Sequence, residues 1–195
     1  DAPTRLLVER SCYDEVVEIA RRAAEATVVG NPEEEGDHIG PLFDQIQFDR
    51  VQNMIQVGID EGANLIVGGM GRPEGFETGW FVRPTIFADV DNTMRIAREE
   101  IFGPVLAIIP FDTEEEAVAI ANDTPYGLAA YVQTGSAERA ARMSRSLRAG
   151  AVHINGGAYE YGSPFGGYKA SGNGREGGEM GLEDFLETKM VHGLA

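Results

Sequence analysis

The 195-residue chain carries 16 basic and 32 acidic side chains, a net charge of −16. A surface this acidic repels polyanions, so we expect no sequence-independent binding of nucleic acid. The length suits one domain with at most a small appendage, and the longest apolar runs, such as Val105–Pro110, are far too short to cross a bilayer.

The chain begins at Asp1, without an initiator methionine or a signal peptide, as a fragment or a processed product would. Cys12 is its only cysteine, which excludes an internal disulfide. Because this cysteine usage fits a reducing compartment, we expect a cytoplasmic protein.

Hydrophobic periodicity predicts strands that alternate with helices. Gly62 ends the second helix, and Thr113 followed by Glu116 resembles a capping box. The alternation predicts an α/β fold, with a mostly parallel sheet flanked by helices. In chain order, we predict strand Thr4–Val8, helix Tyr13–Thr27, loop Asn31–Gly40, helix Phe43–Glu61, strands Asn64–Val67, Phe81–Phe87 and Val105–Pro110, helix Thr113–Asn122, strand Leu128–Val132, helix Ala137–Leu147 and strand Ala151–Ile154.

The last third of the chain changes character. Asn155–Gly181 is rich in glycine and has little apolar periodicity, and a loop of this length is usually functional or disordered. Aromatic residues spread through it, including Tyr159 and Tyr161, argue against disorder. The tail, Leu182–Val191, is predicted to hold a short helix followed by a strand.

The residues EEIFGPV at Glu99–Val105 form a first candidate site. Gly103 precedes a proline, which favours an extended path, and residues two apart then point to the same side. Glu100 and Phe102 can therefore face one ligand, with the carboxylate accepting hydrogen bonds from sugar hydroxyls and the ring packing on an apolar face. The alternative is a surface acidic pair that merely enters a strand.

The glycine-rich loop that follows strand Ala151–Ile154 forms a second candidate site. Ligands of open α/β sheets bind beyond the carboxyl ends of strands, so the loop is well placed to shape a pocket. The alternative is a structural loop whose glycines permit tight turns. Gly172, Gly174 and Gly177 match the dinucleotide-binding pattern G-x-G-x-x-G, but the strand that must precede that pattern is absent.

Other reactive residues give weaker signals. Cys12 lies near a helix start, where a thiolate is somewhat favoured, but the sequence places no histidine beside it, and we interpret it as structural. The three histidines lack the spacing of metal ligands, so no metal site is predicted.

Five stretches together resemble the aldehyde dehydrogenase family. They occur in the family's order and at its usual separations, and the resemblance covers essentially the whole chain. The stretches are Asp1–Arg5, Glu99–Val105, Pro125–Ala129, Ile154–Gly156 and Pro164–Glu176.

The resemblance implies roles for particular residues. Glu100 and Phe102 would bind the nicotinamide-side ribose of NAD or NADP, and Phe165 would line the aldehyde pocket. Glu176 would help to relay protons. Arg175 and Glu187 would form an interface-supporting pair. A strand at Phe185–His192 would join the sheet of a neighbouring subunit in a homodimer or a larger homo-oligomer.

The resemblance also implies a reaction, in which a cysteine thiolate attacks an aldehyde to give a thiohemiacetal that is oxidised to the acid. The family's cysteine stands one position before the residue matching Asp1, and the main cofactor-binding domain lies upstream, so we expect this chain alone to be inactive. Residues 1–181 would be a catalytic-domain portion and residues 182–195 an oligomerisation segment. The alternative is a non-catalytic oligomerisation or interaction module that reuses the fold.

Overall fold

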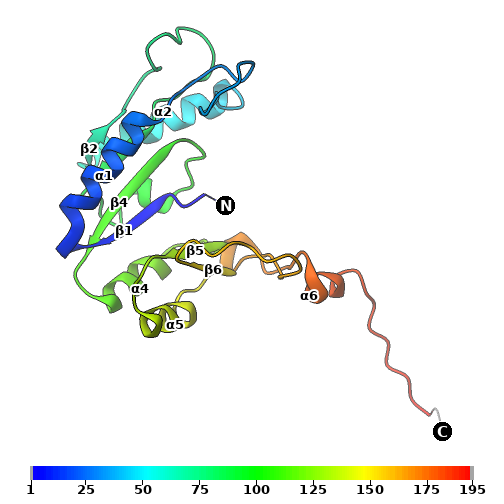
Figure 1. Cartoon of the computed structure of the whole chain (residues 1–195). Coiled ribbons are helices and arrows are strands. Elements are labelled where there is room, and N and C mark those ends of the chain that lie inside the picture. The colour runs from blue at the N-terminus through cyan, green and yellow to red at the C-terminus, as the bar shows by residue number, and fades with distance from the viewer. Residues whose placement is uncertain (1, 194–195) are drawn as a thin grey trace. The chain divides into compact units, whose positions relative to one another are not determined.

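The structure is a computed structural model that describes residues 2–193. Strands and α-helices alternate along most of the chain, as the periodicity predicted (Figure 1). The elements are β1 (Arg5–Glu9), η1 (Arg10–Cys12), α1 (Tyr13–Ala26), α2 (Gln45–Asp60), β2 (Asn64–Val67), β3 (Thr85–Ala88), α3 (Arg95–Arg98), β4 (Val105–Phe111), α4 (Glu114–Asn122), β5 (Ala129–Val132), α5 (Ala137–Ser146), β6 (Ala151–Ile154), η2 (Lys169–Ser171) and α6 (Gly178–Glu183).

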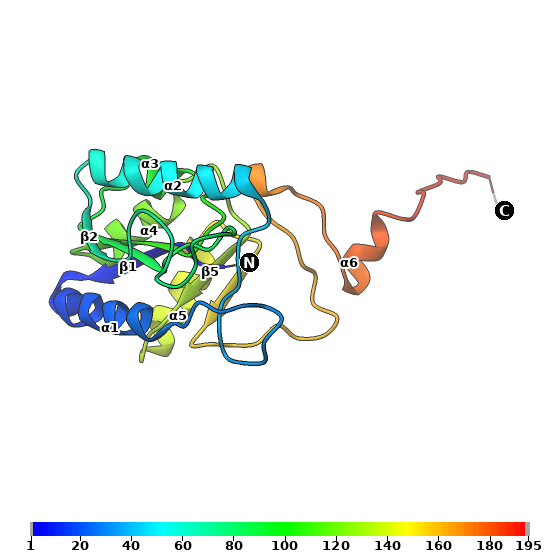
Figure 2. The same ribbon diagram turned by 90° about the horizontal axis from the view of Figure 1, so that it is seen from above.

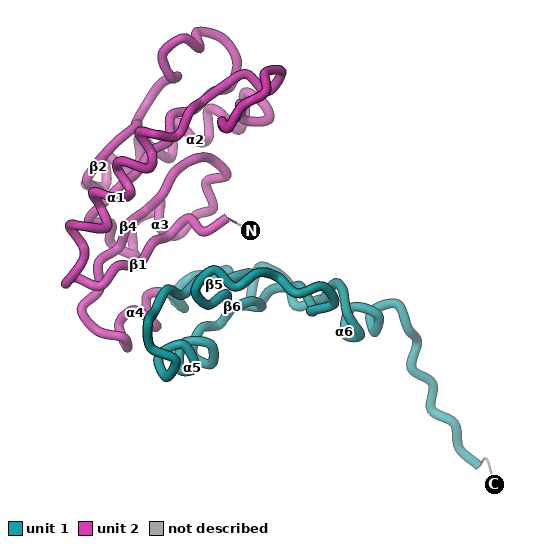
Figure 3. Tube along the Cα trace, viewed as in Figure 1, with its two compact units in different colours: residues 1, 121–195 teal, residues 2–120 magenta. Residues whose placement is uncertain are grey.

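The chain divides into two compact units (Figure 3). Unit 2 holds residues 2–120, and unit 1 holds residues 121–193 of the described chain, so the division falls inside α4. The predicted division after residue 181 separates a catalytic portion from an oligomerisation segment, which is a division by function and not by contacts. It stays a prediction. Residues 194 and 195 of the predicted oligomerisation segment lie outside the described residues.

Unit 2 is built on a four-stranded sheet in the order β1-β4-β3-β2. Strands β1 and β3 both run parallel to the central β4, and β2 pairs antiparallel to β3 at the edge. The prediction of a mostly parallel sheet is therefore confirmed. Strand β3 is shorter than predicted and begins at Thr85, because Pro84 before it has no amide hydrogen to donate to the ladder.

Helices cover both faces of this sheet, with α1 on one face and α2 and α3 on the other (Figure 2). Strand β4 serves both faces because its side chains alternate. Ala107 and Ile109 pack in the cluster that contains α2, whereas Ile108 packs in the cluster that contains Val8 and Tyr13. The middle strand is buried on both sides, as a parallel strand between two helical layers requires.

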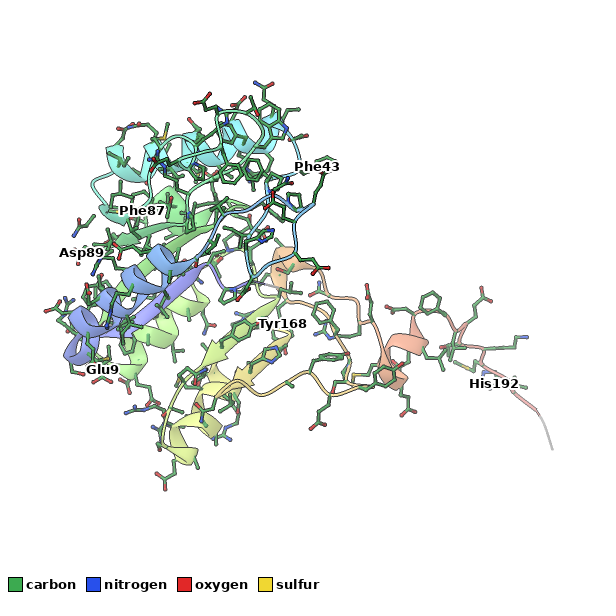
Figure 4. The ribbon with its side chains drawn as sticks, turned by 45° about the horizontal axis from the view of Figure 1, so that its top comes forward. Glu9, Phe43, Phe87, Asp89, Tyr168 and His192 are labelled. Atoms are coloured by element: carbon green, nitrogen blue, oxygen red, sulfur yellow. The ribbon has the colours of Figure 1, made fainter. Side chains whose placement is uncertain are left out.

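Helix α2 is well defined at both ends. The Asp44 side chain caps it by accepting a hydrogen bond from the Gln47 amide at 2.8 Å. Gly62, with a φ of 88°, follows its last turn. Between them, Val51 and Ile55 are fully buried against the sheet, beside Phe87, which is labelled in Figure 4.

The capping of α4 departs slightly from the predicted box. The Thr113 hydroxyl accepts a hydrogen bond from the Glu116 amide at 3.1 Å, as expected. The Glu116 carboxylate, however, accepts from the Asp112 amide at 2.7 Å, one residue earlier than a capping box requires.

Unit 1 contains a two-stranded parallel pair, β5 and β6, followed by the glycine-rich loop. The tail differs from the prediction in two ways. Helix α6 begins at Gly178, four residues before the predicted start. Residues 186–193 run as an extended segment without a strand (Figure 1). A strand exists only when its backbone pairs with another, and the tail has no such partner within the described chain.

The buried face of α2 yields a direct test. Replacing Ile55 by alanine empties a site with no solvent exposure and should lower the free energy of unfolding by about 2–5 kcal/mol. Ile46 lies on the same helix but is 79% exposed, so Ile46→Ala should change that free energy by less than about 0.5 kcal/mol. Urea denaturation followed by circular dichroism measures both, and equal effects of the two variants would contradict the assigned packing.

Candidate functional site

The two neighbouring acids before β4 have different environments. The Glu99 carboxylate forms an ion pair with Arg95 of α3, at 2.7 Å from Nε and 3.3 Å from Nη2. This hydrogen bond lowers the pKa of Glu99. Glu100 is exposed, and its carboxylate has no recorded partner within residues 2–193. Glu99 is therefore structural, whereas Glu100 is free to accept hydrogen bonds from a ligand.

The backbone that carries Glu100 is held by side chains of α2. Arg50 Nη2 donates to the Glu100 carbonyl at 2.6 Å. Gln47 Nε2 donates to both the Ile101 and the Phe102 carbonyls, each at 2.8 Å. Three consecutive carbonyl groups are thus bonded from one helix face, which restrains the turn that the sequence predicted as simply extended.

Phe102 is the exception to that extended path. Its φ is +56°, in the left-handed region that residues other than glycine rarely occupy. Its ring is 62% exposed, while Ile101 beside it is buried. Strained backbone that displays an apolar ring to solvent is more typical of a binding site than of packing.

These groups fit a nicotinamide riboside. A free carboxylate can accept hydrogen bonds from the two ribose hydroxyls, and an exposed phenyl ring two residues away can pack against a flat ring. The chemistry of Glu100 and Phe102 is therefore compatible with the cofactor that the sequence implies, and neither group is committed elsewhere in the described structure.

In unit 1, the glycine-rich loop folds back on itself. The backbones of two further predicted site residues, Phe165 and Glu176, pair with each other. The Phe165 amide donates to the Glu176 carbonyl at 2.7 Å, and the Glu176 amide donates to the Phe165 carbonyl at 2.6 Å. Gly166 permits this approach, since a Cβ there would lie 2.1 Å from the Gly174 carbonyl oxygen. The loop is thus a built structure.

Arg175 ties the loop together. Its Nη1 donates to the carbonyls of Gly167, Asn173 and Gly174 at 2.9, 3.1 and 2.8 Å, and its guanidinium lies 5.6 Å from the Tyr168 ring centre. No ion pair with Glu187 is recorded in the described chain. The pairing of Arg175 with Glu187 stays a prediction for an assembled protein.

Phe165 and Glu176 line one cavity of about 410 Å³, together with three other residues of unit 1. The rings of Tyr159 and Phe165 meet edge to face, with centres 6.4 Å apart. The residues around this open hollow include two aromatic residues and one acidic residue, which suits a small, largely apolar ligand. The lining residues are His153, Tyr159, Phe165, Glu176 and Gly177.

His153 was not predicted as a site residue. Its ring stacks on Tyr131 with centres 4.8 Å apart, and its Nδ1 lies 3.0 Å from the Gly157 carbonyl. A carbonyl oxygen can only accept, so Nδ1 is the donor in this contact. Gln47 and Arg50 were missed as well. No sequence pattern marks them, because their role depends on a turn about fifty residues away.

The remaining candidates carry no chemistry in the described structure. Cys12 is exposed, and its thiol donates to the Glu9 carbonyl at 3.4 Å. Gly172–Gly177 follows the short helix η2 and not a strand, so its context differs from that of a dinucleotide fingerprint. Within residues 2–193, no cluster of metal-binding side chains occurs, and no helix is long and apolar enough to cross a membrane.

Comparison with known proteins identifies relatives over almost the entire chain. The model of the aldehyde dehydrogenase family matches residues 2–191. A 3-succinoylsemialdehyde-pyridine dehydrogenase from a Pseudomonas species is 53% identical over 193 residues, which are 99% of this chain and 40% of that protein.

Two solved structures agree with this match. Aldehyde dehydrogenase C of Pseudomonas syringae, a cysteine-to-alanine mutant in complex with NAD+ and octanal, has a TM-score of 0.97 and 53% identity, covering 100% of this chain and 40% of that one. An aldehyde dehydrogenase from Bartonella henselae has a TM-score of 0.95 and 52% identity, covering 97% and 40%.

The chain thus spans about 40% of the length of these relatives. The match extends through both units, and it includes the turn at Glu99–Pro104 and the glycine-rich loop. The chain belongs to the aldehyde dehydrogenase family.

Proposed function

We propose that this chain supplies the cofactor-facing turn and part of the aldehyde pocket of an NAD(P)-dependent aldehyde dehydrogenase. The observation that carries the proposal is the turn at Glu100–Phe102, where an uncommitted carboxylate and an exposed ring stand on a restrained, strained backbone. A non-catalytic oligomerisation or interaction module would not need an exposed ring and an unpaired carboxylate on a strained turn.

Each part of the site then has a distinct task. Glu100 accepts hydrogen bonds from the ribose hydroxyls, and the Phe102 ring packs beside the nicotinamide. Bound NAD(P) supplies the hydride acceptor for the oxidation. Phe165 forms a wall of the aldehyde pocket, and Glu176 moves protons at its carboxylate oxygens. The nucleophilic cysteine comes from the residues that precede Asp1 in the family's order.

The cavity in unit 1 favours an aldehyde with an apolar body. Aromatic rings dominate its wall, and its one charged lining group, Glu176, would repel a substrate with a carboxylate tail. The octanal complex of the Pseudomonas syringae relative and the pyridine-bearing substrate in the name of the Pseudomonas relative are in line with this preference. We therefore propose neutral, largely apolar aldehydes as substrates.

The neighbouring acids Glu99 and Glu100 provide a matched test of this function. In the protein expressed from its complete gene, Glu100→Gln should raise the KM for NAD or NADP about tenfold, because an amide replaces a charged acceptor for the ribose hydroxyls. The KM for octanal should stay within about twofold. Glu99→Gln removes only the pair with exposed Arg95 and should leave both constants nearly unchanged.

These constants are measured by following reduced nicotinamide during aldehyde oxidation. If wild-type protein oxidised no aldehyde with either cofactor, the proposed function would be wrong. If both glutamine variants behaved alike, the assignment of the ribose to Glu100 would be wrong.

We further propose that the C-terminal segment pairs with a second copy of the chain. Residues 186–193 lie extended and unpaired, and apolar side chains along the tail are exposed. An edge-to-edge strand pairing would satisfy the open backbone groups and cover these side chains. The side chains concerned are Phe185, Leu186, Met190 and Val191, which are 85%, 62%, 78% and 59% exposed.

The proposed pair of Arg175 and Glu187 tests this assembly. Glu187→Lys places two cations together and should shift the protein toward a lower molar mass in light scattering at several concentrations. Glu183→Lys, the same change at the end of α6, should leave the mass unchanged. An unaltered molar mass in Glu187→Lys would refute the pair of Arg175 with Glu187. A wild-type protein that stayed monomeric at every concentration would refute the proposed assembly, and with it the alternative that the chain is an oligomerisation module.

A further inference from the structure

His153 brings a second polar side chain to the cavity in unit 1. Of the other lining residues, Phe165 and Gly177 have no polar group in the side chain, and the Tyr159 hydroxyl already donates to a backbone carbonyl of the same loop. Glu176 carries the carboxylate, which only accepts hydrogen bonds when it is ionised. The imidazole of His153 is therefore the group beside that carboxylate that can bind a polar part of a ligand.

Two contacts fix the direction of the His153 ring. It lies opposite Tyr131 in the register of β5 and β6, and the two rings stack with their centres 4.8 Å apart and an angle of 13° between their planes. Its Nδ1 donates to the Gly157 carbonyl at 3.0 Å. A half-turn of the ring would place a C–H group against this carbonyl and lose the hydrogen bond, so the ring has one preferred orientation.

The same orientation leaves Nε2 of His153 available. Within residues 2–193, the hydrogen bond recorded for this side chain is the one to Gly157. The residue is half-buried, and polar groups in such places usually have a partner in the protein, in water or in a ligand. Because the ring lines the cavity, Nε2 is an oriented and uncommitted group at the site proposed for the aldehyde.

The polar groups of the cavity favour one kind of substrate. A hydroxyl group both donates and accepts, so it can bond to Nε2 of the neutral imidazole, which accepts, or of the protonated imidazole, which donates. A carboxylate would be repelled by Glu176, and an alkyl end would leave Nε2 unpaired. A neutral hydroxyl group therefore satisfies His153 and is compatible with the apolar rings of Tyr159 and Phe165.

We propose that His153 is a specificity-determining residue, whose Nε2 forms a hydrogen bond with a hydroxyl group at the end of the substrate remote from its aldehyde. The preferred substrates are then ω-hydroxyaldehydes with an apolar chain between the two functional groups. The inference rests on the proposed function, because it requires the aldehyde to occupy the cavity lined by Phe165 and Glu176. Oxidation takes place at the aldehyde carbon, and the hydroxyl group is bound without reacting.

The first test compares paired substrates in the protein expressed from its complete gene. Hexanal, octanal and decanal are each measured beside their ω-hydroxy derivatives, by following reduced nicotinamide. At the chain length that fits best, kcat/KM should be about three- to tenfold higher for the hydroxyaldehyde, as expected for one net hydrogen bond. An equal or lower kcat/KM for the hydroxyaldehyde at every length would overturn the proposal.

The second test removes Nε2 and keeps the other hydrogen bond of the side chain. In His153→Asn, the amide nitrogen can replace Nδ1 as the donor to Gly157, but nothing replaces Nε2. The ratio of kcat/KM for the hydroxyaldehyde to kcat/KM for the parent aldehyde should fall to about one. His38→Asn is the matched control, because His38 lies between α1 and α2 and does not line the cavity. An unchanged ratio in His153→Asn would contradict the proposed hydrogen bond.

A third variant separates specificity from a structural role. His153→Phe keeps a ring that can stack on Tyr131 but has no nitrogen, and it takes the place of His153→Asn if that variant fails to fold. It should lower kcat/KM for the hydroxyaldehyde about three- to tenfold and leave kcat/KM for the parent aldehyde within about twofold. Equal losses for both substrates would show that His153 only supports the fold, and would overturn the proposal.

The wild-type protein distinguishes this inference from the proposed function. If it oxidised neither the parent aldehydes nor the hydroxyaldehydes, the proposed function would fall and this inference with it. If it oxidised the parent aldehydes but showed no preference for the hydroxyl group, this inference alone would be overturned.

Discussion

The packing of α2 on the sheet is the constraint on which the site in unit 2 depends. Val51 and Ile55 have no solvent exposure and anchor the helix among the residues of β3 and β4. The same helix then presents Gln47 and Arg50 to the turn before β4. Because these side chains reach the turn from a buried helix, the positions of Glu100 and Phe102 depend on the hydrophobic core as well as on the turn's own sequence.

Most of the fold of unit 2 could be predicted because burial leaves a periodic trace in the sequence. Strand β4 is fully apolar since both of its faces are covered, and α1 and α2 show helical spacing because each covers one face. The failures have local causes. Helix α3 is a single turn, too short to show a period, and β3 starts late because of Pro84. A tail that is extended but unpaired cannot be distinguished from a strand by sequence, because pairing is a property of two segments.

The candidate site was predictable only in part, and the two acids Glu99 and Glu100 show why. The same residue type occurs twice in succession, and no pattern says which one is committed to the fold. The difference arises from Arg95, which lies four residues before Glu99. Arg95 pairs with the Glu99 carboxylate and leaves the Glu100 carboxylate free. Likewise, the positive φ of Phe102 departs from the predicted extended path. Sequence could not show it, because the Phe102 carbonyl is bonded by a side chain of α2, a helix far away in the sequence.

The acidity of the chain also constrains how it can bind a dinucleotide. With a net charge of −16, the surface opposes the negatively charged phosphates of NAD(P). The turn, however, offers a carboxylate and a phenyl ring, which suit neutral hydroxyls and a flat ring and cannot stabilise a phosphate. The groups that this chain is proposed to contribute are therefore those that recognise the uncharged, reactive end of the cofactor. A restrained backbone matters most at that end, because a misplacement of about 1 Å near the reacting atoms can slow catalysis about a hundredfold.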